Sequence, residues 1–142
     1  MKAGWLVLAV GLAACSKDEG GASAAEGTTS STKAEEAKGL SEAQRSIVDA
    51  WKKQGLEPSE LTATKGFGKD CSAGTVDKIE VVICEFASEA EAKKAEQPGL
   101  DWVGSTTGAA WTAGSLVIAV ADRKKSDPHG KTINQLMKST PK

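Results

Sequence analysis

Apolar residues recur at helical spacing from the point where mixed polar and apolar sequence begins. Ser41 and Gln44 have the form of a capping box, in which each side chain bonds the other residue's backbone N–H group. The apolar positions of this segment are Leu40, Ala43, Ile47, Val48 and Trp51. With Gly55 as a stop, the spacing predicts a helix over about 41–54 whose Ile47 and Trp51 side chains face the core.

The middle of the chain carries strand patterns followed by a second helix pattern. A short strand is expected at residues 60–65, and residues 79–86 form the clearest strand, β-branched and preceded by a turn at residues 74–77. Ser88 and Glu91 make a second capping box, which opens a helix rich in alanine. We expect this helix to end before Pro98 and to lie close to the surface that it covers.

The last third of the chain predicts a hairpin and then a helix. Residues 106–112 and 116–121 flank a turn at residues 113–115, and the second run is almost continuously apolar, which suits a central strand covered on both faces. Asp127 as the cap and Pro128 at the first helical position open the final helix. Its apolar stripe is Ile133, Leu136 and Met137.

Together these patterns predict one globular α+β domain over residues 40–142. The expected order is helix, strand, strand, helix, strand, strand, helix, with about four strands in a small antiparallel sheet and the helices on one face. This order resembles ferredoxin-like folds with an additional helix. The pattern leaves the order of the strands within the sheet open.

The N-terminal part has a different composition. Residues 5–14 are an apolar run of about ten residues, and a helix that spans a bilayer needs about 20, so residues 1–14 fit a secretory signal better than a membrane span or a buried helix. Residues 16–39 contain no Leu, Ile, Val, Met or aromatic residue, so they cannot bury enough apolar area to offset their chain entropy. We therefore expect residues 15–39 to be a disordered spacer; a tail that folds on a partner is the alternative.

The end of the apolar run, Leu12-Ala13-Ala14-Cys15, resembles the lipobox of bacterial lipoproteins. The resemblance implies that a diacylglyceryl group is attached to the Cys15 thiol and that a peptidase cuts before this residue. It further implies that the chain is held in the cell envelope by its N-terminal lipid. Ser16 resembles the residue that leads to the outer membrane in enteric bacteria with two membranes.

Lipidation of Cys15 would leave two cysteines, Cys71 and Cys84, in an exported and therefore oxidising compartment. We expect them to form a disulfide, with α-carbons within roughly 4.4–6.8 Å. The loop of about 14 residues would stabilise the domain by roughly 3 kcal/mol in the chain-entropy model. A metal or redox role is the alternative, although a redox pair usually has only two intervening residues.

Charge and chemistry exclude some classes of function. The formal net charge is −1, and residues 40–142 carry 14 basic and 14 acidic side chains, so no basic surplus favours nucleic acid as a partner. His129 is the only histidine, and its spacing from Asp122 and Asp127 matches no metal site. The glycines of residues 104–108 lack the lysine of a phosphate loop. We therefore predict no cofactor, no metal and no catalytic set.

Two groups of side chains are candidates for a binding surface. Trp51, Trp102 and Trp111 could line an aromatic groove for a sugar or a peptide, or could pack in the core and at its rim. Arg123, Lys124 and Lys125 make the C-terminal end locally basic, either as a solvated face or as a patch for anionic lipid or cell-wall polymer.

The pattern as a whole predicts a membrane-anchored envelope lipoprotein with a non-enzymatic domain that binds an envelope protein or polymer. A small enzyme that acts on envelope polymers is one alternative. Another is an inhibitor of an envelope hydrolase, which would present the loop at residues 74–78 to its target. An exposed and rigid loop there would favour the inhibitor.

Overall fold

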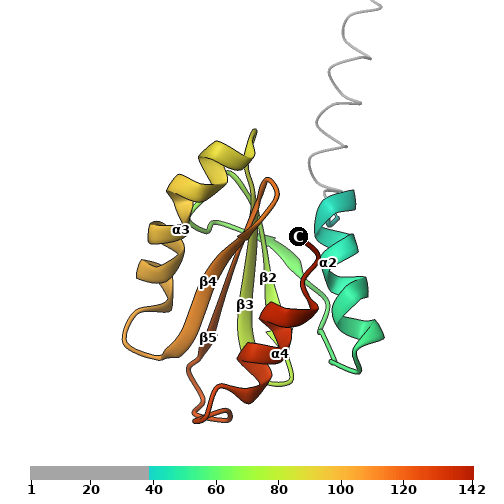
Figure 1. Ribbon diagram of the computed structural model, residues 1–142, viewed down its shortest axis with the longest axis vertical. Helices are drawn as coiled ribbons and strands as arrows, with labels where there is room; N and C mark the ends of the chain where they lie inside the picture. The colour runs from blue at the N-terminus through green and yellow to red at the C-terminus, as the bar shows by residue number, and fades with distance from the viewer. Residues whose placement is uncertain (1–38) are drawn as a thin grey trace, which may run out of the picture. The chain divides into compact units, whose positions relative to one another are not determined.

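The computed structural model describes residues 39–142 (Figure 1). The predicted signal at residues 1–14, Cys15 and the predicted spacer up to residue 38 lie outside the described residues. The described elements are α2 (Glu42–Lys53), β1 (Thr62–Thr64), β2 (Asp70–Val76), β3 (Ile79–Glu85), α3 (Glu89–Val103), β4 (Thr107–Ala113), β5 (Leu116–Asp122) and α4 (Lys131–Ser139). The α+β class, the three helices and the disulfide are confirmed.

The sheet has five strands in the order β1-β2-β3-β5-β4, and all neighbours are antiparallel. The expected count of about four was too low, because β2 covers most of the segment that was predicted as a turn. Gly74 lies inside β2, where a Cβ atom would come within 2.8 Å of the Ser59 hydroxyl oxygen. This glycine therefore allows the chain before β1 to cross close to the strand, and the turn itself is only Asp77 and Lys78.

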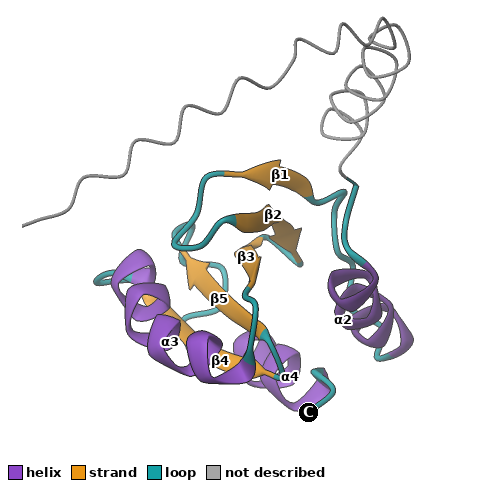
Figure 2. Cartoon of the chain, turned by 90° about the horizontal axis from the view of Figure 1, so that it is seen from above, coloured by secondary structure: helices purple, strands orange, loops and turns teal. Residues whose placement is uncertain are grey.

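Helices cover both faces of the sheet, which corrects the expectation of one covered face (Figures 1 and 2). Helices α2 and α4 pack on one face, where Ile47, Trp51 and Leu136 join the main core with strand residues such as Ile83 and Ile118. Helix α3 packs on the other face, where Ala92, Ala95 and Val103 contact Val117, Ala119 and Ala121. Every residue of β5 is buried, so the expectation of a central strand covered on both faces is confirmed.

The connections between the strands match a ferredoxin-like fold over β3, α3, β4 and β5, but not at β2. Strands β3 and β4 are joined through α3 and lie on either side of β5, which is the split βαβ unit of that fold. The position on the other side of β3 is filled by β2, the strand that directly precedes it. Both hairpins, β2–β3 and β4–β5, close through two-residue turns, as right-handed strand twist favours. Asp77 and Lys78 both have positive φ angles in the first turn, and Gly114 has one in the second.

Helix α3 runs five residues beyond Pro98, which corrects its predicted end. Pro98 is exposed, so the carbonyl group that it leaves without a helical donor faces water. The next residue, Gly99, allows this part of the helix to pack closely on the sheet, because it has no side chain. A Cβ atom on Gly99 would lie 3.1 Å from the Ala110 Cβ atom and 3.4 Å from the Val117 side chain. The prediction that this helix lies close to the surface that it covers is confirmed.

Helix α4 begins at Lys131, three residues after its predicted first residue, Pro128. The residues between form a turn in which the Gly130 N–H donates to the Asp127 carbonyl at 3.0 Å. The Asp127 carboxylate still caps the helix, because it accepts from the N–H groups of Lys131 at 2.8 Å and Ile133 at 3.1 Å. Asp127 therefore caps the helix as predicted, although the helix starts later in the chain than predicted.

Candidate functional site

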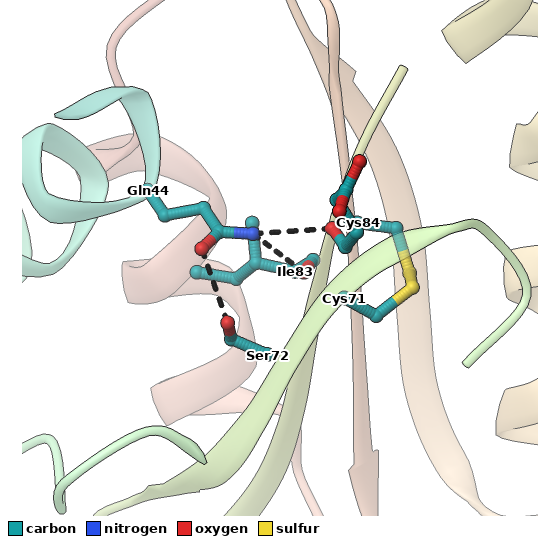
Figure 3. The surroundings of a disulfide bond; sticks show 6 residues. Gln44, Cys71, Ser72, Ile83 and Cys84 are labelled. Carbon is teal, nitrogen blue, oxygen red and sulfur yellow. Dashed lines mark hydrogen bonds between the residues drawn. A yellow bond between two sulfur atoms is a disulfide. The ribbon is translucent and has the colours of Figure 1, made fainter. Parts of the chain in front are cut away.

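The Cys71–Cys84 disulfide joins directly opposite residues of β2 and β3 (Figure 3). The register from the two-residue turn makes them a non-hydrogen-bonded pair, the kind in which opposite α-carbons lie closest. Their α-carbons are 4.0 Å apart, slightly closer than the 4.4–6.8 Å expected for bridges in general. Both cysteines are buried and form a cluster with Val82, against which Phe67, Phe86 and Trp102 pack.

Gln44 ties helix α2 to the same end of the sheet, on the opposite face from the disulfide (Figure 3). Its side-chain amide donates to the Ile83 carbonyl at 3.2 Å and to the Asp70 carbonyl at 3.3 Å. Its oxygen accepts from the Ser72 hydroxyl at 3.1 Å and from the Ser41 N–H at 3.2 Å. The predicted capping box is present, and its glutamine also bonds two strands of the sheet.

The three tryptophans do not form one groove. Trp51 is fully buried in the main core, and its indole N–H donates to the Leu136 carbonyl and the Thr140 hydroxyl, both at 3.2 Å. Trp111 packs against that core from β4, and its indole nitrogen is buried without a hydrogen-bond partner among the described residues. Trp102 lies on the opposite face, against the clusters that contain Val82 and Ala119. The placement of Trp51 on a binding surface is therefore wrong, and Trp102 alone of the three meets the basic segment.

Arg123 lies over the Trp102 ring, with its guanidinium carbon 5.0 Å from the ring centre. Its Nε donates to a Glu80 carboxylate oxygen at 2.8 Å, and one terminal nitrogen donates to the Trp102 carbonyl at 2.9 Å. The ion pair is exposed, so its contribution to stability is small. Its structural effect is to hold the planar guanidinium in one place with further N–H donors directed away from these partners.

Lys124 and Lys125 follow Arg123 in the exposed loop between β5 and α4. This loop lies at the end of the domain opposite the start of α2 (Figure 1). Ser105, Thr106 and Thr107 line a hollow of about 460 Å³ together with Arg123 and Lys125. Three residues with hydroxyl groups and two cationic residues thus line one open hollow, and such side chains suit an anionic group. The Thr106 hydroxyl already donates to the Val103 carbonyl at 2.9 Å.

Asp122 lines the same hollow, but its carboxylate is already bonded to the turn that follows. It accepts from the Asp127 N–H at 2.6 Å, and from the N–H and hydroxyl of Ser126 at 2.8 and 3.0 Å. Burial alone would raise the pKa of Asp122, but these hydrogen bonds outweigh it and hold the pKa below its ordinary value. His129 is exposed in the next turn, and no group of three or more His, Cys, Asp or Glu residues that could hold a metal ion occurs within residues 39–142.

The segment considered as an inhibitory loop is mostly strand. Gly74, Thr75 and Val76 belong to β2, and Val76 is fully buried. Only Asp77 and Lys78 project, and an Asp77 carboxylate oxygen accepts from the Glu57 N–H at 3.3 Å. The criterion for favouring the inhibitor, an exposed and rigid loop across residues 74–78, is therefore not met.

Glu80 is the residue of this site that the sequence analysis missed. The strand pattern at residues 79–86 gave no reason to single out this carboxylate. The register places Glu80 opposite Ala121, two residues before Arg123, so the sheet brings together side chains that are 43 positions apart in the chain. The available signal was an acidic residue and a basic residue near the ends of two predicted strands, without the strand order that pairs them.

Comparison with protein-family models, with curated protein sequences and with solved structures finds no match for this chain. Among the helices that the structure describes, none is both long and apolar enough to cross a membrane.

Proposed function

We propose that this chain is a lipid-anchored protein of the bacterial cell envelope whose domain is a non-enzymatic binding module. The Cys71–Cys84 bridge is the observation that carries the proposal. Disulfides persist in exported proteins and are rare in the cytosol, so a buried bridge agrees with the export implied by the lipobox at Cys15.

The Arg123–Trp102 surface is the proposed contact site, and its partner is an acidic envelope component, either protein or polymer. We define this surface as Trp102, Arg123, Lys124 and Lys125. Arg123 is held in place by Glu80 and the Trp102 ring, so little side-chain entropy is lost when it binds. The lysines beside it are exposed. The loop that carries Arg123, Lys124 and Lys125 lies at the end of the domain opposite the start of α2 (Figure 1).

Site-specific photo-crosslinking of the full chain in its native envelope tests this contact. A photoreactive amino acid at Lys124 should capture an envelope component, and Arg123→Ala should reduce that capture. The same probe at Lys94, which is exposed on α3, is the matched control and should not capture it. No product at Lys124, or the same product at Lys94, would contradict the proposed surface.

A further inference from the structure

The two edges of the sheet differ in how well they are protected. Strand β1 at one edge has only three residues, and short edge strands are a common protection against pairing with another chain. Strand β4 at the other edge has seven residues in unbroken register with β5. Its sequence, Thr-Gly-Ala-Ala-Trp-Thr-Ala, contains no charged residue and no proline. Strand β4 therefore lacks each of the usual protective features.

The backbone of β4 has hydrogen-bonding groups on its outer side. The two-residue turn makes Ala113 and Leu116 a hydrogen-bonded pair, so alternate residues from Ala113 back to Thr107 bond to β5. The N–H and C=O groups of Gly108, Ala110 and Thr112 consequently point away from the sheet. Figure 1 looks onto this edge, with α3 on one side and α4 on the other and no helix in front of β4.

Large apolar side chains are exposed on both flanking helices. Within residues 39–142, the exposed large hydrophobic residues are Leu100, 41% exposed, and Met137, 40% exposed. On α3, Trp102 packs toward the β3 side of the sheet, so Leu100, about 160° away around the helix, points toward the β4 side. On α4, Gln135 reaches α2, and Met137 similarly lies on the side toward β4. The open edge is thus bordered by one apolar side chain on each face of the sheet.

We propose that the β4 edge is a homodimer interface, in which β4 of one chain pairs antiparallel with β4 of a second copy. A two-fold axis at Ala110 would pair that residue with itself and Gly108 with Thr112 of the other copy. This arrangement forms about six backbone hydrogen bonds. It also brings Leu100 toward its own counterpart on one face of the continuous sheet, and Met137 toward its counterpart on the other.

A second copy suits this edge for reasons of charge and size. Self-pairing places identical strands opposite each other, and like charges opposite each other would be destabilising, but β4 carries none. Apart from Trp111, its side chains are small, so a second backbone can approach. The same patch serves both partners, as a closed two-fold dimer requires. The inference rests on the domain alone and is independent of the proposed binding surface and of the lipid anchor.

Amide hydrogen exchange of the domain at residues 39–142, which has its own core, tests the pairing directly. At concentrations where the domain is monomeric, the outward N–H groups of Gly108, Ala110 and Thr112 should exchange fast, while those of Ala109 and Trp111 stay protected. At high concentration, the outward groups should become protected as well. Fast exchange of the outward groups at concentrations up to about 1 mM, the weak limit of specific association, would overturn the proposal.

Sedimentation equilibrium with charged variants provides a second test that leaves the strand intact. Leu100→Lys and Met137→Lys alter exposed positions, so the fold should survive, and each should weaken dimerisation by about tenfold or more. Ala90→Lys, on the exposed face of α3, is the matched control and should leave the dimer unchanged. A protein that stays monomeric at all concentrations would overturn the proposal, and an extended peptide of another protein would then be the occupant of the edge. A dimer whose dissociation constant is unchanged by Leu100→Lys and Met137→Lys would overturn it as well.

Discussion

At the scale of single residues, polar side chains with several backbone partners fix the ends of elements. Gln44 bonds strands β2 and β3 from helix α2, and Asp122 bonds the turn that leads to α4. Each side chain has its hydrogen bonds to neighbouring protein groups. These two residues therefore stabilise the frame on which the Arg123–Trp102 surface is presented.

Replacing Gln44 with alanine should lower the free energy of unfolding by about 1–3 kcal/mol, because the Ile83 carbonyl and the Ser72 hydroxyl lose a buried partner. Urea unfolding followed by circular dichroism measures this loss. Gln54→Ala, at the exposed end of the same helix, is the control and should cost less. Equal losses in the two variants would contradict the assigned role of Gln44.

The depressed pKa of Asp122 predicts a loss of stability in acid. Because the pKa is below 3.8 in the folded state, the unfolded chain binds the proton first as pH falls. The stabilisation by the ionised Asp122 carboxylate is thus complete well above pH 3.8. It disappears as pH falls through the lower pKa that Asp122 has in the folded state. Asp122→Asn should destabilise the domain at neutral pH and make its stability less sensitive to acid, whereas exposed Asp49→Asn should do neither. Urea unfolding across pH 2–7 measures the stability at neutral pH and its loss in acid. If Asp122→Asn lost stability in acid as steeply as the unchanged protein does, the stabilising role of the Asp122 carboxylate would be refuted.

At the scale of elements, local signals predicted where regular structure starts better than where it continues. The capping box at Ser41 and the Ser88 side chain, which accepts from the Glu91 N–H, mark the starts of α2 and α3, because a cap depends on residues only three apart. Strand β2 and the last turn of α3 depend instead on tertiary contacts. Gly74 and Gly99 resemble breakers in the sequence, but each occupies a place where another segment approaches too closely for a side chain.

The pairing of β2 with β3 also determines what the disulfide contributes. The double change Cys71→Ala with Cys84→Ala should lower the free energy of unfolding by about 2–4 kcal/mol, since the bridge restricts the unfolded chain. Crosslinking at the Arg123–Trp102 surface should persist at urea concentrations below the lowered unfolding midpoint, because the bridge makes no hydrogen bond to Trp102, Arg123 or Glu80 among the described residues. Chemical unfolding of the oxidised protein and of the double variant measures the difference. Equal stability of the two proteins would contradict a stabilising role.

At the scale of the whole molecule, the cysteine count and the export motif predicted the disulfide, while the candidate site was predicted only in part. Arg123, Lys124 and Lys125 are exposed together, as their adjacency in the chain implies. The tryptophans are distributed over two faces of the sheet, and sequence spacing carries no information about that distribution. The pairing of Arg123 with Glu80 likewise follows from strand order, which the sequence left open.

The central claim is that an exported, lipid-anchored chain carries this disulfide-bonded domain, and intact mass spectrometry of the protein extracted from membranes tests it most directly. We predict a chain that lacks residues 1–14 and carries acyl mass on Cys15. We further predict that Cys71 and Cys84 resist alkylation until they are reduced. Cys15→Ser should remove the acyl mass and leave the bridge intact. A mature chain that begins elsewhere, carries no lipid, or holds two free thiols at Cys71 and Cys84 would contradict the account.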